Sequence, residues 1–511
     1  MINKTRLVIL FFAFALISTA QTLDVKWGAE TDIPNKNDVY RVFPGADNSI
    51  YIIRIRNYVN IASRYYIEKY EGPDHGFKFE AEIELPEYNK KDVEFKEVMA
   101  VGKKLYVFST YYSNDEDKNY CFASEINQAN GAIGALVKID EIVSNKKGNI
   151  GYFRMRKSID ESKVLVFHHD PFEKYANEKF NYQVLDENMK VVHSSSFVFP
   201  YLDQKFNISN YTVDKDGNIF LLASIERENQ DKEWGKPWYR FVVLSYMYKT
   251  KELKEYKVEV GDKYVTDITF RHNDKNNSLV VVGFYSEKSS GGLKGSFLME
   301  IDKESKRLVR TGSKDFSAEL LANFMREGQA KRGKEPKAVS IDHVLFTDDG
   351  GIIIVAEQSY VITRCSTSSG TTTCVETHHD KSIIISKVNK TGEFEWSSVI
   401  PKLQVSVRSL YGSYYLTRVK DKVFIIYNDD PDNITAQGNK ELSNFEIGKK
   451  GVVVLATVDA KGNVSRKVTM EEEEKSKTVL APKVSIPLTD GEAMVFACWG
   501  KKMRFGKMLI N

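Results

Sequence analysis

Short apolar runs, each introduced by a tight polar turn, recur along most of the chain. The segment TDDGGIIIVAEQSYV, from Thr347 to Val361, shows the pattern clearly. Its DDGG portion contains residues that tolerate positive φ or bond their own backbone, so it predicts a turn. The IIIVA run that follows is short and β-branched, which is typical of a strand buried on both faces.

This unit recurs in eight groups of strands. Comparable apolar strands after polar turns are SIYIIRIR, LYVFSTYY, VLVFHH, IFLLASI, SLVVVGFY, VFIIYN and AMVFACWG. A second repeat, in FLMEIDKESKRLV and LATVDAKGNVSR, joins an alternating strand through a polar turn to another strand. Groups of four antiparallel strands at intervals of about 55–70 residues predict an all-β fold, a β-propeller.

We predict eight four-stranded blades, or seven if the first or last pair of groups is divided differently. The last group has only three strands, whereas LDVKW near the N-terminus has no hairpin partner directly after it. Pairing of LDVKW with the C-terminal MRFGKMLI would complete the last blade and remove the open sheet edge. Since one blade has too small a core to stand alone, residues 21–511 are predicted to form a single domain.

Residues 1–20 have the composition of a secretory signal peptide. Lys4 and Arg6 precede the apolar run VILFFAFALI, and the small residues STA precede Gln21, where we expect cleavage. That run is too short to span a bilayer, and no other apolar run approaches the required length of about 18 residues. The sequence therefore predicts an exported protein, periplasmic or extracellular, without a membrane span.

The overall charge is nearly balanced. Lys and Arg total 73 and Asp and Glu total 70, and two of the basic residues lie in the predicted signal peptide. This balance gives no reason to expect nucleic acid as a partner. The common phosphate-loop, dinucleotide, zinc-protease and serine-hydrolase motifs are absent, so no cofactor is predicted. We expect a monomer.

Long insertions are predicted to gather on one side of the ring. Antiparallel alternation places the loops after the second and fourth strands of every blade on the same side. The insertions ENQDKEWGKPW and NDDPDNITAQGNKELSNFEIGKK, a hairpin extension at about 359–381 and a helical insertion at about 316–333 all belong to this class. This elaborated face is the predicted working face, because binding sites are usually built from loops on a rigid scaffold.

The helical insertion is predicted to be one helix. Phe316, Leu320, Leu321 and Phe324 recur at helical spacing. Ser317, or Asp315 as the alternative, can cap its N-terminus.

The cysteines are predicted to differ in role. Cys365 and Cys374 flank STSSGTTT, a hairpin tip between extended arms, which indicates a disulfide in an oxidising compartment. Cys121 and Cys498 lie in separate apolar strands, where we expect small buried hydrophobic side chains.

Several of these segments together resemble a family of uncharacterised exported β-propeller proteins of Bacteroidetes-type bacteria. They are RYYIEKYE, ANFMREGQAKRG, TDDGGIIIVAEQSYV, SIIISKVNKTGEFEWSSVIPKLQVS, KDKVFIIYNDDPD and RFGKMLI. The resemblance covers most of the chain after the signal peptide. It implies a bacterial exported protein and supplies no catalytic or binding residues.

Aromatic side chains on the elaborated face are the predicted ligand-binding residues. Trp234, Trp238 and Tyr239 lie in one insertion and Tyr360 in another. Exposed aromatics stack on sugar rings or anchor a protein partner. The alternative is that they pack down onto the ring.

Metal-binding candidates are weaker. His168 and His378 each begin a His-His-Asp triplet near a strand end, at 168–170 and 378–380. Asp429, Asp430 and Asp432 offer oxygen ligands in one loop. Adjacent residues on a strand point to opposite faces, and a plain loop explains the aspartates, so structural roles are favoured and no metal is predicted.

Two functions therefore remain. The first is an exported, non-catalytic propeller that binds a protein or a glycan on its elaborated face. The alternative is a hydrolase or lyase acting on a surface polymer at the mouth of the ring. An enzyme requires convergent titratable groups of shifted pKa, whereas a binder requires an exposed apolar or aromatic patch.

Overall fold

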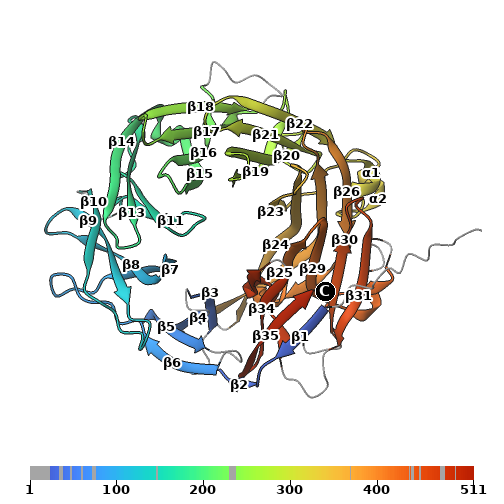
Figure 1. The fold of residues 1–511 in the computed structure, drawn as a ribbon, viewed down its shortest axis with the longest axis horizontal. Helices are drawn as coiled ribbons and strands as arrows, with labels where there is room; N and C mark the ends of the chain where they lie inside the picture. Colours follow the sequence, from blue (N-terminus) through green and yellow to red (C-terminus); the bar gives the residue numbers. More distant parts are fainter. Residues whose placement is uncertain are drawn as a thin grey trace, which may run out of the picture.

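The strands of the protein form a ring (Figure 1). The computed structural model describes residues 23–510 except 34–37, 46–48, 59–60, 72–75, 145–147, 229–236, 290, 369, 437, 439–441, 448–450, 472–477 and 490. The predicted signal peptide and Trp234 lie outside the described residues.

Eight antiparallel sheets, called blades 1 to 8, follow one another around the ring. Blades 1 and 2 consist of β3 (Asp38–Pro44), β4 (Ile50–Tyr58), β5 (Ile61–Glu71), β6 (Gly76–Glu82), β7 (Glu94–Val101), β8 (Lys104–Ser113), β9 (Lys118–Ile126) and β10 (Val137–Val143). Blades 3 and 4 consist of β11 (Tyr152–Lys157), β12 (Lys163–His169), β13 (Asn177–Asp186), β14 (Val191–Leu202), β15 (Phe206–Val213), β16 (Ile219–Glu226), β17 (Tyr239–Met247) and β18 (Glu252–Val258). In each blade the first strand is innermost.

Blades 5 and 6 consist of β19 (Tyr264–Asn273), β20 (Ser278–Ser286), β21 (Gly295–Asp302), β22 (Leu308–Asp315), β23 (Val339–Phe346), β24 (Ile352–Ser368), β25 (Thr371–Val388) and β26 (Phe394–Ile400). Blade 7 consists of β28 (Tyr415–Val419), β29 (Lys422–Asp429), β30 (Val452–Val458) and β31 (Val464–Glu471). Blade 8 contains β32 (Val479–Leu480), β33 (Ile486–Thr489), β34 (Glu492–Trp499) and β35 (Lys502–Ile510).

The N-terminal strand β1 (Leu23–Trp27) completes blade 8. It pairs antiparallel with β35, Leu23 opposite Ile510 and Trp27 opposite Gly506. The short β2 (Thr31–Asp32) pairs with the start of β35. The predicted propeller with eight blades and N-to-C closure is therefore confirmed, and the seven-blade alternative is wrong.

The hydrophobic core lies between neighbouring blades. Every residue of β20 is buried, as expected for a strand covered on both faces. The outer strand β22 is almost wholly exposed. At the junction that closes the ring, Ile50 and Ile52 of blade 1 belong to one cluster with Phe496 and Met503 of blade 8.

The DDGG turn forms as predicted. The Asp349 carboxylate accepts a hydrogen bond from the Gly351 backbone N–H at 3.0 Å, and Gly350 has φ of +80°. In the DKDGN turn, Asp214 accepts from the backbone of Asp216 at 3.0 Å and of Asn218 at 2.9 Å. The Asp214 carboxylate therefore organises its own turn.

A β-bulge recurs in the innermost strands, which the sequence pattern does not predict. The register shifts lie between Val39/Arg41, Phe95/Glu97, Ile208/Asn210, Val265/Asp267 and Ile341/His343. Each bulge inserts one extra residue near the elaborated end of the strand and re-aims the side chains that follow. These shifts set which polar groups face the centre of the ring.

The prediction of a single inserted helix is wrong, because the insertion forms two short helices, α1 (Ala318–Leu321) and α2 (Glu327–Ala330). The Ser317 side chain caps α1, accepting from the Leu320 N–H at 3.2 Å. The Asn323 side-chain amide then donates to the Glu319 and Leu320 carbonyls, and Arg326 is extended. Side-chain competition for backbone carbonyls ends the first helix. Phe316, Leu321 and Phe324 are nevertheless buried together, with Leu320 packed against them.

The hairpin extension is formed by the outer ends of β24 and β25. Its base is covered by β27 (Gln404–Ser406), which pairs with His378 to Asp380. Asp380 is buried there and accepts a hydrogen bond from the Ser359 hydroxyl at 2.8 Å. The described residues between 363 and 376 are all exposed. Only this outer part projects from the ring.

Four short 3-10 turns complete the described structure: η2 (Asp203–Lys205), η4 (Ser409–Tyr411), η5 (Pro431–Ile434) and η7 (Pro482–Val484). None of the helices in the described ranges has the length and apolar character needed to cross a membrane.

Candidate functional site

A pocket of about 480 Å³ opens on the elaborated side of blade 4. It is called the Trp238 pocket. Three segments meet there: η2 with the start of β15, the end of β16, and the start of β17. Its lining residues are Gln204, Lys205, Phe206, Asn207, Ser224, Glu226, Trp238, Tyr239 and Phe241.

The aromatic wall of the pocket is fixed by the backbone. Trp238 accepts a hydrogen bond at its carbonyl from the Arg227 N–H at 2.7 Å, and Tyr239 lies opposite Glu226 in the ladder. The Tyr239 hydroxyl donates to the Val265 carbonyl of blade 5 at 3.1 Å. Tyr239 and Phe241 meet edge to face at 5.6 Å. Trp238 therefore lies directly before β17, with its backbone carbonyl bonded to Arg227.

The exposure of these rings fits a binding role. Trp238 is 64% exposed, although large aromatics usually bury most of their surface. Tyr239 is 38% exposed, and burial of its inner part raises the pKa of its hydroxyl. Phe206, at the floor, is buried and stacks on Tyr201 at 5.7 Å.

Polar groups surround the aromatic wall. Asn207 and Ser224 lie opposite each other in the β15–β16 ladder, so both belong to one rung of the sheet. Lys205 forms an ion pair with Glu228 at 2.6 Å. Glu226 and Gln204 complete the polar lining. Apolar rings with a few amide, hydroxyl and carboxylate groups are the usual composition of a pocket for a small ligand.

The predicted ligand-binding residues do not form one site. Trp238 and Tyr239 share the pocket, whereas Trp234 lies outside the described residues. Tyr360 lies on the hairpin extension of blade 6, stacked on His379 at 4.8 Å with the Lys381 ammonium 5.2 Å from its ring centroid. Tyr360 therefore packs within its own hairpin. The sequence pattern does not indicate Gln204 and Phe206 as lining residues. Phe241 could be expected, because it lies two residues after Tyr239 on one strand and therefore on the same side.

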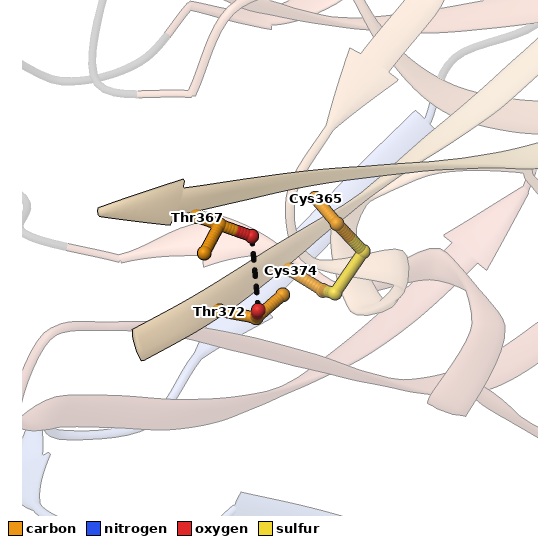
Figure 2. The surroundings of a disulfide bond; sticks show 4 residues. All are labelled: Cys365, Thr367, Thr372 and Cys374. Atoms are coloured by element: carbon orange, nitrogen blue, oxygen red, sulfur yellow. Dashed lines mark hydrogen bonds between the residues drawn. A yellow bond between two sulfur atoms is a disulfide. The ribbon is translucent and has the colours of Figure 1, made fainter. Parts of the chain in front are cut away.

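Cys365 and Cys374 form a disulfide at the hairpin extension (Figure 2). They lie opposite each other in the β24–β25 ladder with Cα atoms 4.0 Å apart. Beyond them the Thr367 and Thr372 hydroxyls are hydrogen-bonded at 3.0 Å. Cys121 and Cys498 are free and buried.

The histidine candidates are not assembled into a metal site. His168 lies in blade 3 and His378 in blade 6. The two ring nitrogens of His168 face Asp140 at 2.7 Å and Asp170 at 3.4 Å. Burial lowers the pKa of His168, but these carboxylates outweigh it and raise the pKa to about 9. A protonated imidazole does not ligate a metal.

The aspartate candidates organise their own loop. Asp430 caps η5, accepting from the Asp432 N–H at 3.0 Å. Asp429 is fully buried and accepts from the Asn433 amide at 2.6 Å and the Asp430 N–H at 2.9 Å. Burial raises the pKa of Asp429 to about 7. No group of three or more His, Cys, Asp or Glu within the described residues is placed to hold a metal.

Two carboxyl groups lie near each other on the innermost strands of blades 5 and 6. The Asp267 carboxylate accepts from the Ile341 N–H at 2.6 Å, and Asp342 accepts from the Tyr414 hydroxyl at 2.8 Å. Asp342 keeps a water-accessible surface, although protein atoms surround most of the side chain. This partial burial, together with the negative charges of Glu357 and Asp267, raises the pKa of Asp342 to about 7. Burial also raises the pKa of Asp267.

A hollow of about 530 Å³ lies beside α1 and between blades 6 and 7. Arg466 in its lining donates to the Pro401 and Ala436 carbonyls at 3.3 and 2.5 Å. Its lining includes no aromatic side chain. The Trp238 pocket is therefore the stronger candidate site.

No family model and no curated protein matches the chain. Among solved structures, the WD40 domain of SCAP from fission yeast is similar at 7% identity, covering 96% of this chain and 98% of that chain with a TM-score of 0.40. The β-propeller domain of the Trilobed protease from Pyrococcus furiosus is 10% identical, covering 85% and 96%, with a TM-score of 0.33. A protein of unknown function from Dyadobacter fermentans is 8% identical, covering 71% and 94%, with a TM-score of 0.29. Such values say nothing about function, and the architecture follows from the strand pairing of the chain itself.

Proposed function

We propose that the protein is an exported bacterial propeller that binds a glycan, without catalysis, in the Trp238 pocket. The observation that carries this proposal is the solvent-exposed Trp238 ring, which lines a pocket together with polar side chains. The C–H face of a sugar ring packs on such an aromatic plane, while its hydroxyl groups bond to amide and carboxylate side chains. A protein loop inserted into the same pocket is the other form of this binding function.

Export is supported by two features. The composition of residues 1–20 is that of a signal peptide, and Cys365 and Cys374 are placed to form a disulfide on an exposed hairpin. Disulfides at exposed positions persist in oxidising compartments. The resemblance of the sequence to exported propellers of Bacteroidetes-type bacteria points the same way.

Titration of the protein with a panel of neutral and acidic oligosaccharides tests the binding proposal. We expect at least one oligosaccharide to bind with saturation, and Trp238→Ala to weaken that binding by tenfold or more. Trp499→Ala is the matched control, because Trp499 is also partly exposed, at 36%, and lies at the end of β34 in blade 8. Failure of the whole panel to bind, or equal binding by Trp238→Ala, would refute a glycan site at this pocket.

The alternative function, hydrolysis or elimination on a surface polymer, is favoured by one observation. Asp267 and Asp342 lie on the neighbouring innermost strands β19 and β23, and both have a raised pKa, as general acid–base chemistry requires. The test is the release of new sugar ends from soluble polysaccharides. Activity that is lost in Asp342→Asn and retained in the control Asp421→Asn, at an exposed residue, would support this function. An inactive wild-type protein across the polysaccharides would reject it.

A further inference from the structure

Three arginines on the innermost strands form no direct ion pair with a carboxylate among the described residues. Arg154 and Arg156 lie at alternate positions of β11, so their side chains leave the same side of the strand. Arg271 lies near the end of β19 and donates to the Phe270 carbonyl at 3.0 Å. By contrast, Arg41 on β3 forms an ion pair with Glu97 at 3.3 Å.

Aromatic rings hold two of these guanidinium groups. The Arg154 guanidinium is 5.2 Å from the Tyr152 ring centroid, and that of Arg156 is 5.4 Å from the Tyr211 ring centroid. Tyr211 belongs to β15 of the next blade, so Arg156 reaches across a blade boundary. The cation–π contacts orient the side chains and leave their N–H edges for other partners.

Arg271 interacts electrostatically with Arg156, which shares one side of β11 with Arg154. The Asn210 amide donates to the Thr269 hydroxyl at 3.2 Å, which ties β15 to β19, and Thr269 lies two residues before Arg271. Burial, and then the positive charge of Arg156, lower the pKa of Arg271. Burial raises the pKa of Glu97, and the charges of Arg41 and Arg156 partly offset that effect. The charge of Arg156, on β11 of blade 3, therefore acts on Glu97 of blade 2 and on Arg271 of blade 5.

On β23 of blade 6, the Asp342 carboxyl accepts a hydrogen bond from the Tyr414 hydroxyl at 2.8 Å. His343 is the titratable residue of β23 next to Arg271, and burial and the charge of Arg271 lower its pKa to about 4. The imidazole is therefore neutral at pH 7. Like charges gathered in a partly enclosed space repel one another, and a bound anion would relieve that repulsion.

We propose that Arg154, Arg156 and Arg271 form an anion-binding site at the centre of the ring, for a ligand that carries a carboxylate, phosphate or sulfate group. Guanidinium groups bind such groups through paired, charge-assisted N–H donors. This site shares no residue with the Trp238 pocket, so either proposal can fail without the other.

Binding of citrate, inorganic phosphate, sulfate and an oligogalacturonate, each titrated at constant ionic strength with chloride as the balancing salt, tests the proposal. We expect saturable binding of at least one probe and a melting temperature that rises with its concentration. Arg156→Gln and Arg271→Gln should each weaken that binding at least tenfold. Arg64→Gln should not, because Arg64 lies on the third strand of blade 1 and is exposed.

A comparison of the probes identifies the ligand source. Preference for citrate or oligogalacturonate indicates a carboxylated ligand. Preference for phosphate or sulfate indicates a ligand that carries a phosphate or sulfate group. In chloride alone, Arg271→Gln should melt at the same or a higher temperature than the wild type, because one repelling charge is removed. The proposal is overturned if none of the four probes binds with saturation, or if both glutamine variants bind as the wild type does.

Discussion

Leu23 and Ile510 lie opposite each other in the β1–β35 ladder, so the two ends of the described chain are joined in one sheet. The same ladder sets Trp27 against Gly506, and the Arg504 guanidinium lies 4.3 Å from the Trp27 ring centroid. Closure of the ring therefore involves the β1–β35 and β2–β35 ladders, the hydrophobic cluster between blades 1 and 8, and the Trp27 side chain.

Gly506→Ala should destabilise the protein through this ladder. A Cβ at Gly506 would lie 2.7 Å from a Trp27 ring carbon and 3.0 Å from a Val25 methyl carbon. We expect a loss of about 1–3 kcal/mol in the free energy of unfolding, as for other overpacked sites. Chemical denaturation of Gly506→Ala, Trp27→Ala and the double variant measures the coupling. If Gly506→Ala costs as much without the Trp27 ring as with it, the clash is not at this contact.

Glu68→Gln should be among the most destabilising single changes in the chain. Arg54 and Glu68 are both fully buried and their side chains meet at 2.5 Å, where the Tyr70 hydroxyl also donates to Glu68 at 2.8 Å. Removing one partner leaves an uncompensated buried charge, which costs about 3–5 kcal/mol.

The exposed pair Arg64–Glu82, at 3.3 Å, is the control for that measurement. Arg64→Gln should cost less than about 1 kcal/mol, because water screens exposed pairs. Equal losses for Glu68→Gln and Arg64→Gln would show that burial of the Arg54 pair has no energetic consequence.

Asp429 should make the stability of the protein fall as pH rises. Burial raises its pKa to about 7 in the folded protein, from an ordinary value of 3.8. Between these values the folded state holds a proton that the unfolded state has lost, so unfolding becomes easier by up to about 1.4 kcal/mol per pH unit. The contribution of Asp429 to the free energy of unfolding does not change with pH below 3.8, and its loss is complete above about 7.

Asp429→Asn removes this titration and keeps an oxygen that can accept from Asn433. Urea unfolding at pH 5 and pH 8 should show that the wild type loses on the order of 2 kcal/mol more than Asp429→Asn over this interval. Asp432→Asn, in the same loop but exposed, should behave as the wild type. Parallel pH profiles for wild type and Asp429→Asn would exclude a raised pKa at this site.

Shortening the hairpin extension should be tolerated only beyond its base. Replacing residues 364–375 with a two-residue Asn-Gly turn removes exposed residues and the disulfide, and should change the melting temperature by no more than about 2 °C. Deleting 359–381 removes Asp380, which accepts from Ser359 and lies 3.6 Å from the Lys483 ammonium. In calorimetry, the variant that lacks 359–381 should no longer unfold cooperatively. If both hairpin variants unfold as the wild type does, the whole hairpin lies outside the core.

The features that could be predicted from the sequence are those set by neighbouring residues. The turn at Asp349 and the buried strand after it follow from local residue preferences, and the unpaired segments LDVKW and MRFGKMLI were sufficient to predict closure. Trp238 and Tyr239 are adjacent in the chain, so their shared position in the pocket could also be predicted. Phe206 joins them from the preceding blade junction, and no local pattern indicates that contact.

The central arginines were missed for the same reason. Arg156 and Arg271 come from blades 3 and 5, and the side of β19 on which Arg271 lies depends on the bulge between Val265 and Asp267. The division of the predicted helix likewise depends on a specific competition by Asn323 for backbone carbonyls.

The position of β1 on the outer edge of blade 8 has a consequence for folding. β1 precedes and β35 follows all the other described strands, so blade 8 can be completed only after β35 has been synthesised. Until then the β1 backbone has unpaired donors and acceptors, the kind of open edge that leads to misassembly in growing chains. A chain that lacks β35 (Lys502–Ile510) would therefore keep an unpaired edge on its first strand.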